Sequence, residues 1–274
     1  MISDPTVPDI TVAGMGVAAV VQVTAQTATR IRQCRHALHA DSGIGTDDYL
    51  AARCETVTNL YGLTYGESDS RVAGYHRTAA AVIDAAMTAG PVIYLTHGHP
   101  LVFCYSSFLI RDLAGLLGLS VELLPGLSSM DSLFADLWLD PGVGGIQMFE
   151  ATDLLLRRRR LAPDVPALIW QVGNLETRLY TTKTSKPARM VRFRDWLLQT
   201  YPATHPITAC YASPHPAAGP QRWTFHLANI ADHAAALHPG ITLYVPACAV
   251  RPVQDFGLLN ALDSAEHLMA ITED

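Results

Sequence analysis

The segment Tyr94–Phe103, YLTHGHPLVF, decides the fold class of this chain. It begins in an apolar run, residues 91–96, and passes through a turn rich in Gly, His and Pro before helix-like sequence resumes at 106–117. In an open α/β sheet, ligands bind beyond the carboxyl ends of the strands. Gly98 allows the backbone to approach a ligand closely, and Phe103 offers an aromatic wall. The segment therefore predicts either a pocket for a small aromatic cofactor or an ordinary loop with a surface histidine.

The first half of the chain alternates apolar runs with helix-like sequence. Strands are expected at residues 10–13, 91–96 and 121–124, and helices at 20–37, 47–54, 70–87 and 106–117. Gly90 and Gly118 stand just after two of these helices, as stop signals do. The alternation predicts a mainly parallel sheet with helical crossovers.

The second half mixes shorter helices with strands. Helices are expected at 128–138, 152–159, 189–200 and 231–237, and strands at 146–150, 167–172, 207–212, 222–227 and 241–245. The last three strands have no long helix between them, which favours antiparallel pairing. Pro125-Gly126 is the expected junction, so the predicted domains are 1–124 and 125–250, followed by a tail, 251–274. Its amphipathic stretch, Leu258–Met269, is expected to pack on the domain or on a partner subunit.

The composition is that of a chain with a sizeable core. It has 274 residues, of which 49% are hydrophobic and 16% charged, and this length suits one large or two moderate domains. No apolar run reaches the ~20 residues of a membrane helix, and the N-terminal sequence lacks a signal-peptide pattern. A net charge of −6 without a large basic field argues against a nucleic acid as the main partner.

The cysteines and histidines predict neither disulfides nor a metal site. Five cysteines without a CxxC pair indicate free thiols in a reducing cytoplasm. His97 and His99 are two residues apart, and His36 and His39 are three apart on a stretch expected to be helical. Neither pair belongs to a zinc-ligand pattern with cysteines or carboxylates.

Tyr65, Arg71 and Tyr75 are the candidate catalytic residues. Arg71 and Tyr75 are four residues apart and so share one helix face, while Tyr65 precedes the helix and can fold back over its first turn. A guanidinium beside a phenol is expected to lower the pKa of the tyrosine and to donate hydrogen bonds to an oxyanion. The alternative is an exposed helix with a stacked Tyr–Arg pair.

Further motifs stand in a specific order along the chain. They are GHP at 98–100 with VF at 102–103, LPGLS at 124–128, FAD at 134–136, DP at 140–141 and QVG at 171–173. In this order and spacing, residues 10–246 resemble the tetrapyrrole methylase-like family of S-adenosylmethionine-dependent methyltransferases. Within that family the chain looks most like the borosin peptide backbone α-N-methyltransferases.

The resemblance extends to the candidate catalytic residues. Borosin methyltransferases carry Y-x5-R-x3-Y, which Tyr65, Arg71 and Tyr75 match. The resemblance implies that these residues remove the proton of a backbone amide and hold the negative oxygen of the resulting imidate. One departure lies upstream, where the group has another tyrosine: this chain has Gly62 there, and Tyr61 is one residue further away.

The resemblance also implies S-adenosylmethionine as the cofactor. Positions expected to contact it are His99, Val102, Phe103, Ser128, Ser129, Val172 and Ala212. Ser128 or Ser129 can instead, or in addition, be the N-cap of the following helix. No metal is required, because the methyl group is already activated on sulfur.

The resemblance implies a two-domain α/β fold with mixed sheets, an active site in the cleft between the domains, and an intertwined homodimer. Since the chain has no repetitive peptide tail, we expect a split enzyme that methylates a separate precursor peptide in trans. Arg157–Arg160 are either a solvated helix end or a docking patch for an acidic partner segment. The rival interpretations are a tetrapyrrole C-methyltransferase and a non-catalytic methylase-like protein that only binds a peptide.

Overall fold

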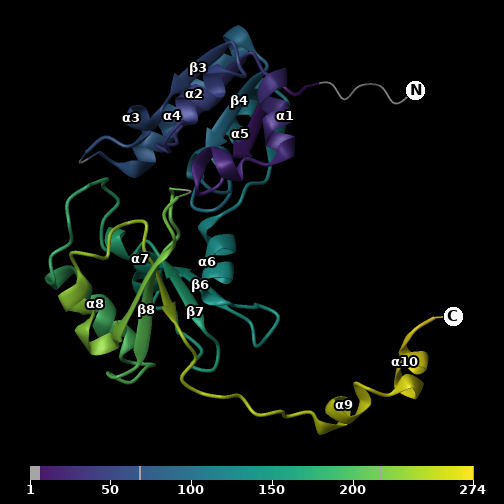
Figure 1. The fold of residues 1–274 in the computed structure, drawn as a ribbon, viewed down its shortest axis with the longest axis vertical. Helices are drawn as coiled ribbons and strands as arrows, with labels where there is room; N and C mark the ends of the chain where they lie inside the picture. Colours follow the sequence, from purple (N-terminus) through teal and green to yellow (C-terminus); the bar gives the residue numbers. More distant parts are fainter. Residues whose placement is uncertain (1–6, 68, 216, 274) are drawn as a thin grey trace.

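The computed structural model describes residues 7–67, 69–215 and 217–273, and it has two α/β domains with a C-terminal tail (Figure 1). All strands of the first sheet lie between residues 10 and 124, and all strands of the second lie between 147 and 245. The predicted two-domain α/β fold is therefore confirmed. Pro125-Gly126 follows the last strand of the first sheet, where we propose that the first domain ends.

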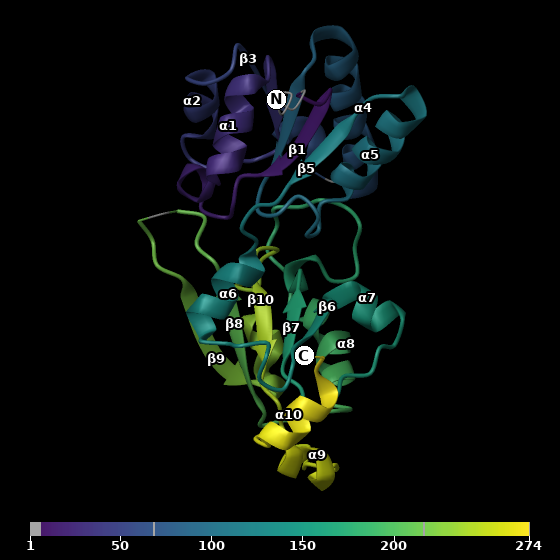
Figure 2. The same cartoon turned by 90° about the vertical axis from the view of Figure 1, so that its right-hand side faces the viewer.

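The first sheet is parallel throughout, with the strand order β3-β2-β4-β1-β5. Its strands are β1 (Ile10–Gly14), β2 (His36–His39), β3 (Thr56–Asn59), β4 (Val92–Thr96) and β5 (Val121–Leu124). The helices of this domain are α1 (Ala25–Gln33), α2 (Thr46–Ala51), α3 (Tyr61–Thr64), α4 (Arg71–Ala89) and α5 (Tyr105–Leu117). Helices α4 and α5 cover one face of the sheet, and α1 and α2 cover the other (Figure 2).

The prediction of one helix at 20–37 is wrong, because this stretch contains three separate elements. A 3-10 turn, η1 (Ala19–Gln22), precedes α1, and β2 then pairs with β3 and β4. Thr24 starts α1 by accepting a hydrogen bond from the backbone N–H of Thr27. A strand of four residues is too short to show an alternating pattern. The sequence therefore predicted β2 as part of a helix and predicted no element at β3. His36 and His39 consequently lie on a strand.

The second sheet is mixed, with the order β6-β7-β10-β8-β9. Its strands are β6 (Gln147–Glu150), β7 (Ala167–Trp170), β8 (Pro206–Tyr211), β9 (Gln221–His226) and β10 (Thr242–Val245). Strands β6 and β7 are parallel, while β8 pairs antiparallel with both β9 and β10, as predicted for the last three strands. The other elements are α6 (Ser129–Leu137), α7 (Ala151–Leu156), η2 (Val172–Asn174), α8 (Ala188–Leu197) and η3 (Leu227–His233).

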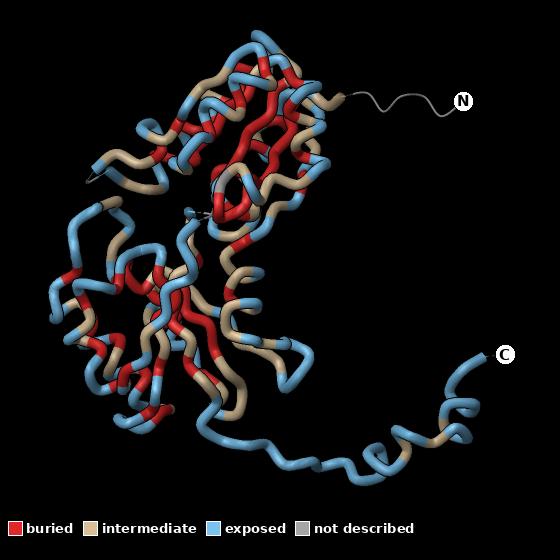
Figure 3. The backbone as a smooth tube through the Cα atoms, viewed as in Figure 1, coloured by how far each residue is buried: buried red, intermediate tan, exposed pale blue. Residues whose placement is uncertain are grey.

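Each domain has its own core, visible as separate buried centres (Figure 3). Clusters on both faces of the first sheet are built on Ile10, Val82 and Ile110 on one side and on Ile31, Leu50 and Ile93 on the other. In the second domain, α7, α8 and η3 pack their apolar residues against the sheet. Two separate cores leave the space between the domains for a ligand.

The tail runs away from the second domain in an extended path (Figure 1). It contains α9 (Phe256–Ala261) and α10 (Ala265–Ile271), which are short helices without a buried residue. Within the described ranges, no helix has the length and apolar character needed to cross a membrane.

Candidate active site

A cavity of about 240 Å³ lies at the carboxyl end of the first sheet and is walled by both domains. Small-molecule sites are typically about 300–1,000 Å³, so this cavity is near the lower end of the usual size. The first domain contributes the residues after β4, together with Tyr65 and Tyr75. From the second domain come the ends of β7 and β8, Trp170 and Tyr211. The predicted position of the site, between the domains and beyond the strand ends, agrees with this geometry.

Three backbone segments meet at the base of the cavity, and each does so at a glycine. A Cβ atom on Gly14 would lie 2.2 Å from the carbonyl oxygen of Gly98, and one on Gly126 would lie 2.7 Å from the Cα atom of Gly14. No side chain fits at Gly14 or Gly126. The loops after β1, β4 and β5 are therefore held backbone to backbone, and this fixes the floor on which a ligand would rest.

The two predicted catalytic tyrosines lie together in the wall of this cavity. Tyr75 is in the second turn of α4, which Ser70 caps at its N-terminus, and Tyr65 follows α3. The ring of Tyr65 lies between those of Tyr61 and Tyr180, with centroid distances of 5.1 and 5.4 Å. Neither the Tyr65 nor the Tyr75 hydroxyl has a hydrogen-bond partner among the described residues, so both are available to a ligand.

The expected direction of the tyrosine pKa is wrong. Burial raises the pKa of Tyr75, and the nearby Arg71 charge offsets this only in part. Burial also raises the pKa of Tyr65, with Tyr75 as the next cause. Desolvation of a phenolate therefore outweighs the attraction of one guanidinium. Both phenols therefore keep their protons at neutral pH and can donate hydrogen bonds to a ligand.

Arg71 joins the two domains instead of bonding to a tyrosine. Its guanidinium donates to the side-chain oxygen of Gln171 at 3.1 Å and to the backbone oxygen of Thr177 at 2.8 Å. Arg71, Tyr75 and Gln171 line a groove beside the main cavity together with Phe103. The arginine is thus brought to the edge of the site, next to Tyr75, by contacts with the second domain.

Most of the predicted cofactor positions border the cavity. His99, Val102, Phe103, Ser128, Ser129 and Ala212 line it. Val172 does not, because its side chain is fully buried in the core of the second domain. Ser128 is the N-cap of α6: its oxygen accepts from Met130 N–H and its hydroxyl donates to Asp131. That leaves the neighbouring Ser129 as the hydroxyl available to a ligand.

Several lining residues were missed by the sequence interpretation. Thr96, Trp170 and Tyr211 each end a strand, Gln171 follows β7, and Thr242 begins the antiparallel strand β10. Trp170 packs against Phe103 of the other domain, with ring centroids 5.7 Å apart. The preference of ligands for carboxyl strand ends points to Thr96, Trp170 and Tyr211, but not to Thr242, which is at the amino end of its strand.

Tyr61 also has a partner that the sequence did not indicate. Its hydroxyl is 3.2 Å from that of Tyr180, which comes from the second domain. Both rings also pack on the ring of Tyr65, so this contact supports a residue of the cavity wall.

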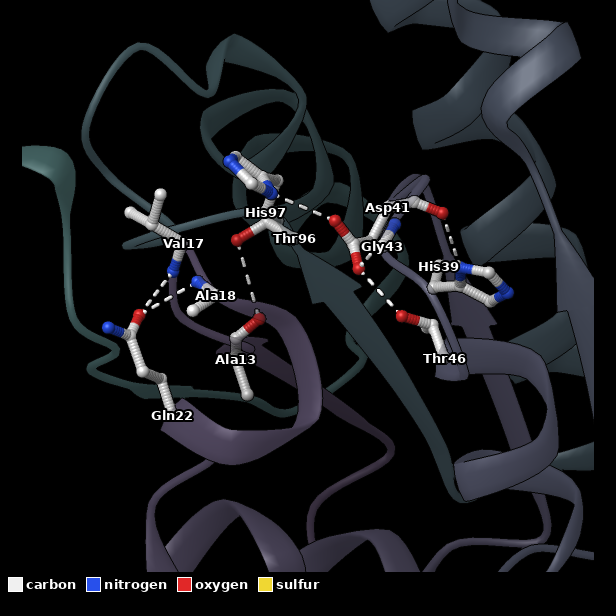
Figure 4. A network of polar contacts seen from close by, with 10 residues as sticks. All are labelled: Ala13, Val17, Ala18, Gln22, His39, Asp41, Gly43, Thr46, Thr96 and His97. Atoms are coloured by element: carbon white, nitrogen blue, oxygen red, sulfur yellow. Dashed lines mark hydrogen bonds and ion pairs between the residues drawn. The ribbon is translucent and has the colours of Figure 1, made fainter. Parts of the chain in front are cut away.

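A polar network around the buried Asp41 lies after β2 and β4 (Figure 4). Asp41 is 1% exposed, and its carboxylate lies 2.9 Å from Nδ1 of His97. The carboxylate also accepts from the hydroxyl of Thr46 at 2.8 Å and from Gly43 N–H at 3.2 Å. Burial alone would raise the pKa of Asp41, but these bonds and the His97 charge more than offset it and lower that pKa. His97 itself lines the cavity.

The lining fits the cofactor that the sequence predicts. Aromatic and aliphatic walls from Phe103, Trp170 and Val102 suit a purine ring, and the hydroxyls of Ser129 and Thr242 suit ribose or amino-acid polar groups. The wall is free of lysine and arginine in the part of the chain that the structure describes. A cationic sulfonium would thus meet no ammonium or guanidinium group from these side chains.

Comparison with known proteins adds independent findings. Residues 9–213 match the family described as Tetrapyrrole (Corrin/Porphyrin) Methylases. The chain is 29% identical, over 189 residues, to a methyltransferase/ribosomally synthesized type II borosin cyclic peptide precursor of Phlebiopsis gigantea, covering 69% of this chain and 34% of that protein. It is 25% identical, over 256 residues, to the methyltransferase/omphalotin A precursor of Omphalotus olearius, covering 93% and 61%.

The chain spans only 34–42% of the length of the first three curated relatives. Among solved structures, the methyltransferase CobJ superposes with a TM-score of 0.64 at 17% identity, covering 89% of this chain and 96% of that one. Uroporphyrin-III-C-methyltransferase from Thermus thermophilus gives 0.60 at 15% identity, covering 92% and 100%. These two structures share the fold.

Proposed function

The chain belongs to the tetrapyrrole (corrin/porphyrin) methylase family, and from this premise we propose that it is an S-adenosylmethionine-dependent methyltransferase acting on backbone amides of a peptide. The observation that carries the proposal is the pair of unpartnered phenols, Tyr65 and Tyr75, in a cavity walled by the predicted cofactor loops. The similarity to borosin methyltransferase-precursor proteins supports the same substrate class.

The geometry suits the chemistry of an amide. The nitrogen of an amide is a poor nucleophile because its lone pair is shared with the carbonyl, and negative charge moves to the oxygen as the N–H proton leaves. Neutral phenols at Tyr65 and Tyr75 donate hydrogen bonds to that oxygen. Arg71, at the edge of the site, adds a positive charge. When bound, the cofactor supplies an activated methyl group, and the Phe103 and Trp170 walls keep water from it.

We further propose the partners and the location that this function requires. The peptide is a separate precursor supplied in trans, and two chains form a homodimer in the cytoplasm. The arginine run remains a candidate docking patch, although Asp153 already pairs with Arg157 and Arg159 at 2.6 and 2.8 Å. Only Arg158 and Arg160 of the run would then be available to an acidic segment.

The second candidate is methylation of a tetrapyrrole. It is considered because solved methyltransferases with this fold include a uroporphyrin-III-C-methyltransferase. A tetrapyrrole carries several carboxylates and needs a basic cleft. Since the described cavity wall has no lysine or arginine, it fits a neutral peptide better. A protein that only binds peptide is the third candidate, and calorimetry with S-adenosylhomocysteine distinguishes it, since a mere binder need not take the cofactor.

Mass spectrometry of a Val/Ile/Gly-rich test peptide incubated with S-adenosylmethionine tests the proposal. Tyr65→Phe and Tyr75→Phe remove only a hydroxyl, and we expect methyl addition to slow roughly 10²–10⁴-fold. Arg71→Lys keeps the charge but loses the planar fork, and should also slow the reaction. Tyr49→Phe on α2 is the matched control. If all three variants methylate at the wild-type rate, the catalytic assignment is wrong.

A further inference from the structure

Methyl transfer to an amide needs a group that takes up a proton. A nitrogen–carbon bond forms, a sulfur–carbon bond breaks, the sulfonium becomes a neutral thioether, and the amide proton is released. The phenols of Tyr65 and Tyr75 keep their own protons at neutral pH because burial raises their pKa. Another group in the cavity wall must therefore accept the proton.

Two histidines line the cavity, and their hydrogen bonds give them opposite tautomers. Nδ1 of His99 accepts a hydrogen bond from Leu101 N–H at 3.1 Å, so the neutral ring carries its proton on Nε2 and is a donor. Nδ1 of His97 lies 2.9 Å from the Asp41 carboxylate, which only accepts, so the neutral ring carries its proton on Nδ1. Nε2 of His97 then has a free lone pair.

The orientation of His97 is fixed by the fold. Asp41 follows β2 and His97 follows β4, and these strands are neighbours in parallel register. Thr46 and Gly43 hold the second carboxylate oxygen of Asp41, so the carboxylate is preorganised toward the ring. Figure 4 shows one ring nitrogen of His97 on Asp41 and the other pointing away from it. A buried carboxylate behind an imidazole both sets its tautomer and stabilises the imidazolium that forms.

We propose that His97 accepts the amide proton on Nε2 and that Asp41 is its positioning residue. This inference rests on the proposed peptide N-methylation. His97 was not among the predicted site residues. In this proposal the tyrosines hold the developing oxyanion, and the histidine receives the proton. The other titratable groups around His97 are His39 and Asp47 behind Asp41, His99 on the same loop, and Tyr65, Tyr75, Tyr94, Cys104 and Tyr211 in the cavity wall.

The first test does not depend on activity. Nitrogen-15 NMR of the histidine rings, in the wild-type protein with S-adenosylhomocysteine, reports which nitrogen carries the proton. We expect the Nδ1-protonated tautomer for His97 and the Nε2-protonated tautomer for His99. His97→Gln identifies the His97 signals by their loss. A neutral His97 ring protonated on Nε2 overturns the proposal, because no lone pair would then face the amide proton.

The second test is kinetic, with S-adenosylmethionine and the Val/Ile/Gly-rich test peptide. We expect His97→Gln to lower kcat roughly 10²–10⁴-fold and to remove the acidic limb of its pH profile, while the Kd for S-adenosylhomocysteine changes less than about threefold. Asp41→Asn should also lower kcat, because the ring of His97 loses the carboxylate that holds its tautomer. His36→Gln, at the opposite end of β2, is the control and should match the wild type.

The outcomes separate this proposal from the proposed function. An active wild-type protein whose His97→Gln variant keeps the rate and the acidic limb overturns the proton-acceptor role alone. The same holds if His97→Gln weakens S-adenosylhomocysteine binding more than about tenfold but leaves the single-turnover rate at saturating cofactor unchanged, since His97 would then be a binding contact. A wild-type protein that binds cofactor but methylates no amide overturns the proposed function and this role with it.

Discussion

The roles proposed for Tyr65 and Tyr75 depend on where their neutral hydroxyls lie and not on ionisation of the phenols. Both line the cavity without a hydrogen-bond partner among the residues that the structure describes, and burial keeps both neutral. A neutral phenol is a strong donor to an oxyanion but a poor proton acceptor. At the residue scale the site is therefore divided between donors on one side and an Asp–His pair on the other.

Asp41 gives the clearest pH prediction. Its pKa in the folded protein is lowered from the ordinary 3.8, so its contribution to stability is complete above about pH 4 and is lost as the pH falls through the folded value. Asp41→Asn should cost roughly 1–3 kcal/mol at neutral pH, because a buried network loses a charged acceptor. Below pH 4 the difference between the two proteins should shrink. Urea unfolding at several pH values measures it, and a constant difference would contradict the assignment.

Gly98 gives a prediction about backbone strain. It has φ +71°, a left-handed conformation, and the nearest atom to an added Cβ is the Leu127 oxygen at 3.9 Å. Space is thus available, and Gly98→Ala should destabilise by roughly 1–2 kcal/mol through the backbone alone. Gly115→Ala is the control, since Gly115 lies within α5 with nothing near its Cβ, and it should stabilise by about 0.5–1 kcal/mol. Equal stability of the two variants would refute the strain argument.

Part of the candidate site was accessible from the sequence at this scale. The spacing of Tyr65, Arg71 and Tyr75 predicted that the three side chains lie near one another, because loop and helix geometry are local, and both phenols do line one cavity. Local spacing gave no sign that Arg71 would bond to Gln171, a residue 100 positions away. Nor did it show that burial would outweigh that charge in the pKa of Tyr75, since burial depends on both domains.

At the scale of elements, a short segment of the second domain closes the tyrosine side of the site. Leu179 forms a bridge with Ser70 just before α4, and Tyr180 N–H donates to the Asp69 carbonyl at 2.9 Å. Glu67 accepts from the hydroxyl of Thr181 at 2.7 Å and from Thr182 N–H at 2.9 Å. These contacts are exposed, so water can replace them. The segment is therefore suited to open for a peptide.

Glu67→Ala should loosen this segment. We expect trypsin to cut at Lys183 on the order of five-fold faster, because the three hydrogen bonds that Glu67 accepts from Thr181 and Thr182 are lost. These hydrogen bonds lower the pKa of Glu67 below its ordinary 4.5, and the bond from Thr181 has the largest effect. The contact is therefore complete above about pH 4.5 and weakens as the pH falls through the folded value. Glu55→Ala, an exposed carboxylate on the far side of the first domain, should leave the cleavage rate unchanged. Equal rates in both variants would show that Glu67 does not restrain the segment.

The elements themselves were predictable in proportion to their length. Long periodic helices such as α4 and α5, and the apolar strands β1 and β4, were found near their observed bounds. The short strand β2 was predicted as part of a helix, because its four residues lie between β3 and β4 and take their conformation from these neighbouring strands. That error hid Asp41 and His97 from the sequence interpretation, since their proximity follows only from the pairing of β2 with β4.

At the scale of the whole molecule, the packing of a single chain does not explain the apolar residues that its tail exposes. Arg251 pairs with Asp164 at its base, and beyond this contact the chain runs away from the second domain (Figure 1). Leu262 and Met269 are 65% and 71% exposed. Soluble proteins rarely leave so many apolar side chains of one segment in water. The amphipathic stretch predicted at 258–269 falls in α9 and α10, neither of which has a buried residue, so it does not pack on its own domain.

We therefore expect the tail to pack on a second copy of the chain. Light scattering at micromolar concentration should give about twice the mass of one chain, because covering the leucines of two tails removes apolar area from water at about 25 cal/mol per Å². The double variant Leu262→Glu and Leu268→Glu should shift the protein to monomers. Asp263→Lys with Glu266→Lys changes the polar residues of the same helical region and should leave the dimer intact. A wild-type chain that is monomeric and still methylates peptide would show that neither the tail nor a partner subunit is needed for the site.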